Sequence, residues 1–164
     1  MKSEPSVFAI DDLARAPKAT TTWEGVRNYQ ARNLLRDEVK VGDLVLYYHS
    51  NAGEGTGVAG VAIVAREGHP DPAQFDKKSE YYDAGATRDT PRWTTVELRF
   101  VLKFAAPVTL EMLRAEPALA GMDVLRRGNR LSVQRVRPEE FDVVCAMATA
   151  PSRPETAGRK TASS

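Results

Sequence analysis

The alternation of hydrophobic and polar residues is clearest between Trp93 and Phe104. From Val96 onward every second residue up to Phe104 is apolar, while charged residues such as Arg99 and Lys103 fall between them. A period of two residues is typical of a strand with one buried face. Two shorter runs of branched and aromatic residues, 44–48 and 58–66, predict further buried strands.

A helical period follows Asn28. Ala31, Leu34 and Leu35 fall on one stripe, whereas Asn28, Arg32 and Arg36 follow one another at four-residue steps. The pattern predicts a helix that ends near residue 39, with Asn28 near its start. One face of this helix packs, and another presents hydrogen-bond donors.

The remaining segments predict short elements joined by long loops. Residues 11–15 form a capped helical turn, Thr109 caps a helix through residue 113, and Pro138 stands in the first turn of a last helix. Residues 69–92 form a long irregular excursion, either a flap over a site or surface decoration. We therefore expect a mixed α+β domain on a strongly bent antiparallel sheet or small barrel over residues 1–149, and a disordered tail over residues 150–164.

The glycines of residues 55–60 formally match a dinucleotide-binding turn. Such a turn must open a helix, so that amide donors face the phosphates, but these glycines run into the apolar residues of a predicted strand. We interpret the segment as a hairpin loop and expect no nucleotide cofactor.

Composition fits one globular domain, because 42% of the 164 residues are hydrophobic and 27% are charged. The sequence shows no signal-like or membrane-spanning apolar run, so we expect a cytoplasmic protein without a membrane partner. Cys145 is the single cysteine and there are two histidines, which argues against a disulfide or a metal site.

The charge distribution excludes binding by bulk electrostatics. The formal net charge is +1, of which residues 151–164 carry +2, leaving −1 for the rest. Any contact with nucleic acid must therefore be local.

Residues 23–35 hold the most promising chemistry. Trp23 and Tyr29 offer stacking surfaces, and Arg27, Asn28 and Arg32 offer hydrogen-bond donors, a combination suited to a planar polar ligand. The alternative is a capped surface helix with an exposed basic edge.

A second cluster lies in residues 126–137, where five arginines surround a Gly128-Asn129 turn and a predicted strand over 131–134. Guanidinium groups bind phosphates through forked hydrogen bonds. The alternative is a solvated hairpin. The arginines that we expect to contact phosphates are Arg126, Arg127 and Arg130.

Five motifs in order resemble the EVE domain family over residues 2 to about 148: KSEP from Lys2, WEGVRNYQAR from Trp23, YYHSN from Tyr47, PRW from Pro91 and RLSVQ from Arg130. The resemblance implies a PUA-like fold, a bent barrel flanked by short helices. It also implies a pocket for a modified cytosine or adenine in DNA or RNA. The positions so implied are Ser3, Trp23, Arg27, Asn28, Tyr29, Arg32, Tyr48, His49, Ser50, Asn51 and Trp93.

From this we expect a monomeric, non-catalytic reader of a modified base that needs no cofactor or metal. Trp23 and either Tyr29 or Tyr48 would be stacking walls, Asn28, His49 and Ser50 would read the base edge, and Arg27 would contact phosphate.

Two other classes stay open. The alternative is a hydrolase of modified nucleosides, in which Lys2, Ser3, Glu4 and His49 converge. In a non-catalytic protein His49 would be a structural hydrogen-bonding residue. A protein-interaction module that uses the tyrosines at 81 and 82 is the third class.

One departure from the family concerns the first strand. Members usually carry aromatic and aliphatic residues before the lysine of the first motif, whereas here Met1 directly precedes Lys2. Either residues upstream of Met1 belong to the chain, or the barrel lacks half an edge strand.

Overall fold

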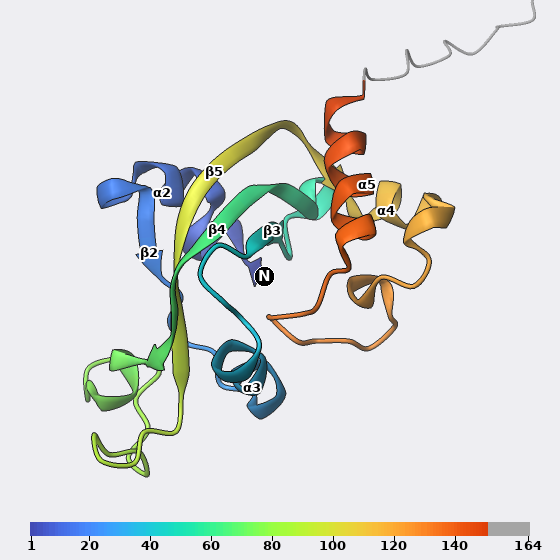
Figure 1. Cartoon of the computed structure of the whole chain (residues 1–164). Coiled ribbons are helices and arrows are strands. Elements are labelled where there is room, and N and C mark those ends of the chain that lie inside the picture. Colours follow the sequence, from blue (N-terminus) through green and yellow to red (C-terminus); the bar gives the residue numbers. More distant parts are fainter. Residues whose placement is uncertain (151–164) are drawn as a thin grey trace, which may run out of the picture.

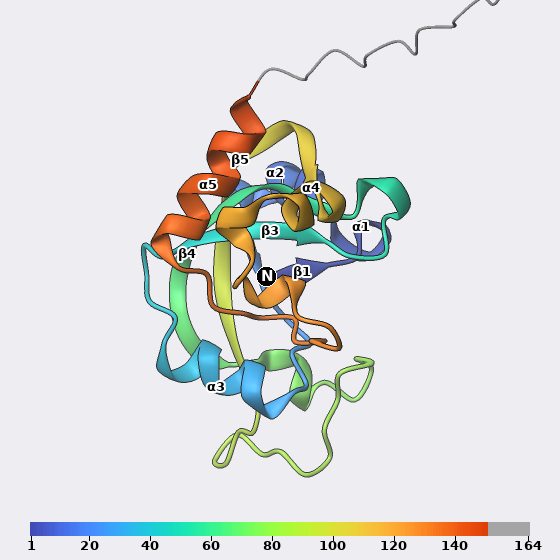
Figure 2. The same ribbon diagram turned by 90° about the vertical axis from the view of Figure 1, so that its right-hand side faces the viewer.

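The computed structural model describes residues 1–150. A five-stranded sheet in the order β1-β3-β4-β5-β2 forms the centre of the domain. Figures 1 and 2 show that its two longest strands bend strongly and run side by side. The strands are β1 (Lys2–Ser3), β2 (Thr20–Thr22), β3 (Leu44–His49), β4 (Gly57–Pro70) and β5 (Thr94–Thr109).

The pairing is antiparallel except between β1 and β3, which run parallel. The β4–β5 ladder shifts register at several points, between Val58 and Gly60 among others. Extra residues of this kind bend a strand and increase its twist. The predicted α+β class and the bent sheet with short helices are confirmed, with the parallel β1–β3 pair as an addition.

Short helices surround the sheet. Figure 2 shows α3 below the sheet and α4 and α5 at its upper side. The helices are α1 (Pro5–Phe8), α2 (Ile10–Arg15), α3 (Tyr29–Asp37), α4 (Leu110–Ala115) and α5 (Pro138–Thr149). Single 3-10 turns lie at Pro17–Ala19, Gly53–Gly55, Pro72–Phe75, Pro117–Leu119 and Asp123–Leu125.

The bent sheet separates two hydrophobic clusters. One contains Tyr47, Val96 and Leu98, together with Leu35 of α3. The other contains Val58, Val108 and Leu113, together with Val144 of α5. Helical spacing on α3 and α5 thus supplies the apolar faces that close each side of the sheet.

The glycine-rich segment, interpreted as a hairpin loop from the sequence, is a loop only at its start: Gly55 ends a 3-10 turn, and residues 57–60 already belong to β4. A Cβ on Gly60 would collide with the side chain of Ile10 and with the carbonyl of Leu102. Glycine is therefore needed here because α2 and β5 approach the backbone of β4 closely.

Two predictions about elements need correction or remain open. Residues 131–134 are not a strand: the Gln134 amide donates to the carbonyl of Leu131 at 2.7 Å, a local side-chain bond that folds the segment back on itself. The predicted tail, beyond Ala150, lies outside the described residues.

No helix among residues 1–150 is both long and apolar enough to span a membrane.

Candidate functional site

An open polar hollow of about 540 Å³ lies between the first turn of α3 and the loop before α5. Asn28 and Gln30 form one wall, and residues 126–131 form the other. We call this site the arginine hollow. Its position brings together the two sequence clusters that were predicted separately.

The loop wall is held by Asn129. Its side-chain nitrogen donates to the carbonyl of Asp123 at 3.1 Å, and its side-chain oxygen accepts from the amide of Leu131 at 3.1 Å. Gly128 has a φ of 77°, which allows the tight turn beside it. Lys2 reaches the same turn from β1, with its ammonium 3.5 Å from the carbonyl of Asn129.

The helix wall is held by Asn28. Its side-chain oxygen accepts from the amides of Gln30 and Ala31 at 2.8 and 3.2 Å and so caps α3. The positive end of the helix dipole therefore faces the hollow. The predicted helix and its start are confirmed.

The arginines of the loop carry the charge of the hollow. Arg126 pairs with Asp123 at 3.4 Å. Arg127 and Arg130 are exposed and form no ion pair with any residue from 1 to 150. Two such guanidinium groups offer forked hydrogen-bond donors, an arrangement that matches the geometry of a phosphate.

An aromatic cluster lies at the same helix start. Tyr29 is 54% exposed and stacks on Trp93 with a centroid distance of 5.0 Å and an interplanar angle of 26°. The guanidinium of Arg32 lies 4.7 Å from the centroid of the Tyr29 ring. Trp93 itself is buried, and its ring nitrogen donates to Asp83 at 2.8 Å. Of the predicted aromatic residues, Tyr29 is the one with a solvent-facing ring.

Trp23 does not have the position predicted for it. Its side chain is only 8% exposed and packs edge to face against Tyr47 at 5.5 Å. Its backbone amide donates to the carbonyl of Val96 at 2.8 Å. This bond to β5 turns the indole into the core, so in this structure Trp23 cannot be a stacking wall.

Arg27 is also placed differently from the prediction. It pairs with Asp71 at 2.8 Å and donates to the carbonyl of Tyr81 at 2.8 and 3.2 Å. Its guanidinium lies 5.3 Å from the centroid of the Trp93 ring. These contacts tie residues 71–92 to the segment before α3 and use the donors that a phosphate would need.

The other predicted residues gather elsewhere, at the ends of β1 and β3. The backbone amide of Ser50 donates to the carbonyl of Ser3, and the side-chain nitrogen of Asn51 donates to the carboxylate of Glu4 at 2.7 Å. Tyr48 is buried in the second hydrophobic cluster. Residues Ser3, Tyr48, His49, Ser50 and Asn51 thus lie together, and none of them lines the arginine hollow.

His49 has a structural partner. Its Nε2 atom accepts a hydrogen bond from the amide of Ile10 at 3.1 Å, which requires the neutral ring, and burial lowers the pKa of His49 below its usual 6.5. With its lone pair engaged, His49 is not poised to take a proton from Ser3. The residues proposed for hydrolysis are near one another without the pairing that the reaction needs.

The His49 contact gives a pH-dependent contribution to stability. The unfolded chain binds the His49 proton more readily than the folded one, so this contribution is complete above about pH 6.5 and is lost as the pH falls below that value. We expect His49→Gln, which keeps an acceptor but does not titrate, to show a smaller drop in Tm between pH 7.5 and 5.5. An equal drop in both proteins, measured by thermal unfolding, would contradict the assignment.

Residues that the sequence did not single out also line the hollow. Gln30, Asn129 and Leu131 lie on it, and their placement depends on contacts between segments about a hundred residues apart. No cluster of three or more metal-ligating side chains is found among residues 1–150.

The bent five-stranded sheet flanked by short helices is the PUA-like α+β fold expected from the sequence. Residues 1–147 match the family described as the EVE domain, and the chain belongs to this family.

Two relatives illustrate the extent of the similarity. Thymocyte nuclear protein 1 of Homo sapiens is 40% identical over 163 residues, which cover 90% of this chain and 72% of that protein. A crystal structure of a Pseudomonas putida protein superposes with a TM-score of 0.85 at 40% identity, over 90% of this chain and 97% of that one.

A third similar structure contains a ligand. It is the crystal structure of human THYN1 in complex with DNA containing 5-methylcytosine, with a TM-score of 0.84 at 39% identity. The match covers 92% of this chain and 96% of that chain.

Proposed function

We propose that this protein is a non-catalytic reader of a modified base in DNA, with 5-methylcytosine as the first candidate. The observation that carries the proposal is the arginine hollow, in which Arg127 and Arg130 are exposed beside the start of α3. The similar human structure, which is a complex with 5-methylcytosine-containing DNA, supports the choice of ligand.

The arginine hollow would receive the backbone of the DNA. Each guanidinium neutralises one phosphate and releases counterions, and the helix dipole of α3 adds to the attraction. The side-chain nitrogen of Asn28 remains available to a ligand, because the capping bonds use its oxygen. Asn28 is therefore the residue of the hollow that we assign to a polar contact beyond the phosphates.

A modified base inside a duplex must be extruded before its edge can be inspected, which costs a few kcal/mol. Stacking on an aromatic ring returns about 1–3 kcal/mol per base. We assign this stacking to Tyr29, which is 54% exposed and stands in the sequence between Asn28 and Gln30 of the hollow. Discrimination by one methyl group is worth only about 1 kcal/mol, so selectivity over unmodified DNA should be about fivefold.

We propose that the protein acts as a cytoplasmic monomer without a metal. Burial raises the pKa of the Cys145 thiol and so disfavours the reactive thiolate, and the ring of His49 is held by the amide of Ile10.

The proposal predicts a large loss of DNA binding when the side chains of Arg127 and Arg130 are removed. We expect Arg127→Ala/Arg130→Ala to bind a 5-methylcytosine oligonucleotide about 10- to 100-fold more weakly and to reduce the salt slope of log K by about two. Fluorescence anisotropy titrations at several salt concentrations measure both quantities.

The matched control is Arg15→Ala/Arg99→Ala, which removes the same charge from exposed positions on α2 and β5. If both double variants lose affinity equally, net charge explains the loss and the hollow is not the binding site. If the unmodified oligonucleotide binds as tightly as the methylated one to the unaltered protein, base reading is excluded.

A further inference from the structure

The carboxylate of Asp83 contacts the indole on which Tyr29 stacks. One of its oxygens accepts from the ring nitrogen of Trp93 at 2.8 Å and from the guanidinium of Arg92 at 2.9 Å. The other oxygen accepts from the backbone amide of Gly85 at 2.9 Å. Both oxygens therefore act as acceptors, which an ionised carboxylate does and a carboxamide cannot do.

The backbone of Trp93 is fixed by other residues. The buried side chain of Gln74 accepts from the amide of Trp93 at 2.9 Å and donates to its carbonyl at 2.9 Å. The amide of Asp71 donates to the same carbonyl at 3.0 Å. These bonds leave the side-chain torsions of Trp93 open, so the hydrogen bond that sets the direction of the indole is the one to Asp83.

Two contacts set the direction of the Tyr29 ring, and both lead to Asp83. The ring stacks on Trp93, which Asp83 holds directly. The guanidinium of Arg32 lies 4.7 Å from the centre of the Tyr29 ring and donates to the carbonyl of Arg92 at 3.1 Å. Arg92 in turn forms an ion pair with Asp83. A ring that is 54% exposed has few other neighbours to fix its rotamer.

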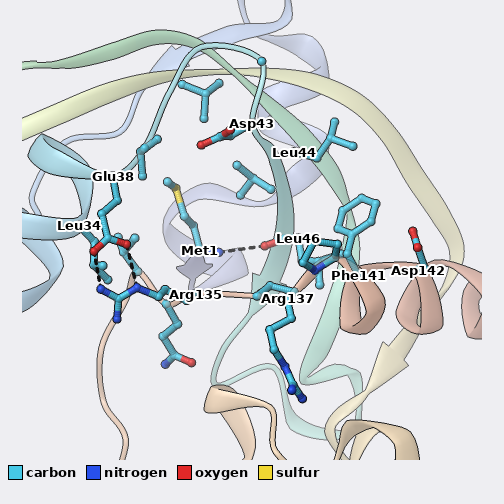
Figure 3. Close-up of a pocket in the computed structure, with 18 residues that line it drawn as sticks. Met1, Leu34, Glu38, Asp43, Leu44, Leu46, Arg135, Arg137, Phe141 and Asp142 are labelled. Atoms are coloured by element: carbon cyan, nitrogen blue, oxygen red, sulfur yellow. Dashed lines mark hydrogen bonds and ion pairs between the residues drawn. The ribbon is translucent and has the colours of Figure 1, made fainter.

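The far end of α3 is held by separate contacts. Leu35 is buried in the first hydrophobic cluster. Figure 3 shows Glu38, the residue that follows α3, in its ion pair with Arg135. A change at Asp83 should therefore loosen the ring at the start of α3 and leave the helix itself in place.

We propose that Asp83 is a positioning residue of the base-reading site, which fixes the indole of Trp93 and thereby holds the exposed ring of Tyr29 ready for an extruded base. This inference rests on the proposed function, and it makes residues 71–92 a support for the Tyr29 ring. A ring that is already oriented loses little rotamer freedom on binding, so the base keeps more of the stacking energy.

Asp83→Asn tests the proposal. Its amide has one oxygen, so either Trp93 or Gly85 faces an NH2 group in place of an acceptor. Loss of a negative charge should by itself strengthen binding to DNA. We expect the opposite result, namely that the 5-methylcytosine oligonucleotide binds about 3- to 10-fold more weakly. The salt slope of log K should stay unchanged, because the phosphate contacts are untouched. Fluorescence anisotropy titrations measure both quantities.

Glu38→Gln is the matched control, since it also removes a carboxylate charge that pairs with an arginine, and it should bind no more weakly than the unaltered protein. Trp93→Phe removes the same bond from the other side, because it keeps a ring against Tyr29 and lacks the indole N–H. It should weaken binding by a similar factor. In a Tyr29→Ala background, Asp83→Asn should cause no further loss of affinity, whereas a general loss of structure would weaken binding in both backgrounds.

The outcomes separate this inference from the proposed function. If Tyr29→Ala weakens binding but Asp83→Asn and Trp93→Phe do not, Asp83 is not a positioning residue and the proposed function stands. An equal loss from Asp83→Asn with and without the Tyr29 ring, or an equal loss from Glu38→Gln, would also overturn the inference. Unchanged binding by Tyr29→Ala would remove the stacking assignment of the proposed function, and this inference with it.

Discussion

Replacing Trp23 with alanine is expected to lower the free energy of unfolding by about 3–5 kcal/mol. The indole is 8% exposed and packs on Tyr47 inside the first hydrophobic cluster, so its removal leaves a cavity that the sheet cannot close. Domains of this size are stable by only about 5–15 kcal/mol. Urea unfolding followed by circular dichroism should therefore show a midpoint far below that of the unaltered protein.

Tyr29→Ala is the matched comparison. Tyr29 is 54% exposed, so its loss should change the free energy of unfolding by about 1 kcal/mol or less while weakening DNA binding. The opposite pattern, in which Trp23→Ala keeps its stability and loses DNA binding, would show that the indole is a binding wall.

The contrast between Trp23 and Tyr29 shows where sequence patterns stop being informative. Both residues are aromatic and both stand among arginines and amides. The burial of Trp23 follows from β2, the strand just before it. The three threonines of β2 resemble a loop in the sequence, but they pair with residues 97–99 of β5. That pairing continues to Trp23 and directs it inward.

Elements with a strong local signal were predicted well. The strands β3, β4 and β5 follow from branched residues and from alternation, and α3 follows from its apolar stripe and from Asn28 at its start. These features depend on residues a few positions apart, where backbone geometry imposes the period.

The candidate site was predicted in part. Asn28 and the arginines Arg126, Arg127 and Arg130 do lie on one hollow. Arg27 was predicted to contact phosphate, but it pairs with Asp71. That partner lies 44 residues away in the sequence, so no pattern near Arg27 could reveal the pair. Ser3 and His49 likewise lie side by side at the end of β3, away from the arginine hollow, because β1 pairs with β3 in parallel. The sequence does not reveal this pairing.

Asp71 is the residue on which the segment from 71 to 92 depends most. It is fully buried, and its carboxylate accepts from Arg27 at 2.8 Å, from the amide of Gly25 at 3.0 Å and from the amide of Ala73 at 2.9 Å. Gly25 in turn lies under the ring of Tyr81, where a Cβ would come within 2.5 Å of the ring. The Asp71 carboxylate thus holds the backbone of Gly25 directly, and it holds Tyr81 through Arg27, which donates to the Tyr81 carbonyl.

We expect Asp71→Ala to lower the free energy of unfolding by about 3–5 kcal/mol, because it leaves the Arg27 charge without its counter-ion and two amides without an acceptor. Urea unfolding measures the total loss. Limited proteolysis should in addition show faster cleavage within residues 76–90, since the segment loses its anchor to the start of α3.

Two comparisons isolate the buried pair. Asp37→Ala removes a carboxylate from a pair with Arg36 in which both side chains are about half exposed, and should shift the urea midpoint far less than Asp71→Ala does. The double variant Arg27→Ala/Asp71→Ala should be less destabilised than the sum of its single variants, because each single change strands the partner of the other. Additive losses would mean that Asp71 acts only through its bonds to the amides of Gly25 and Ala73.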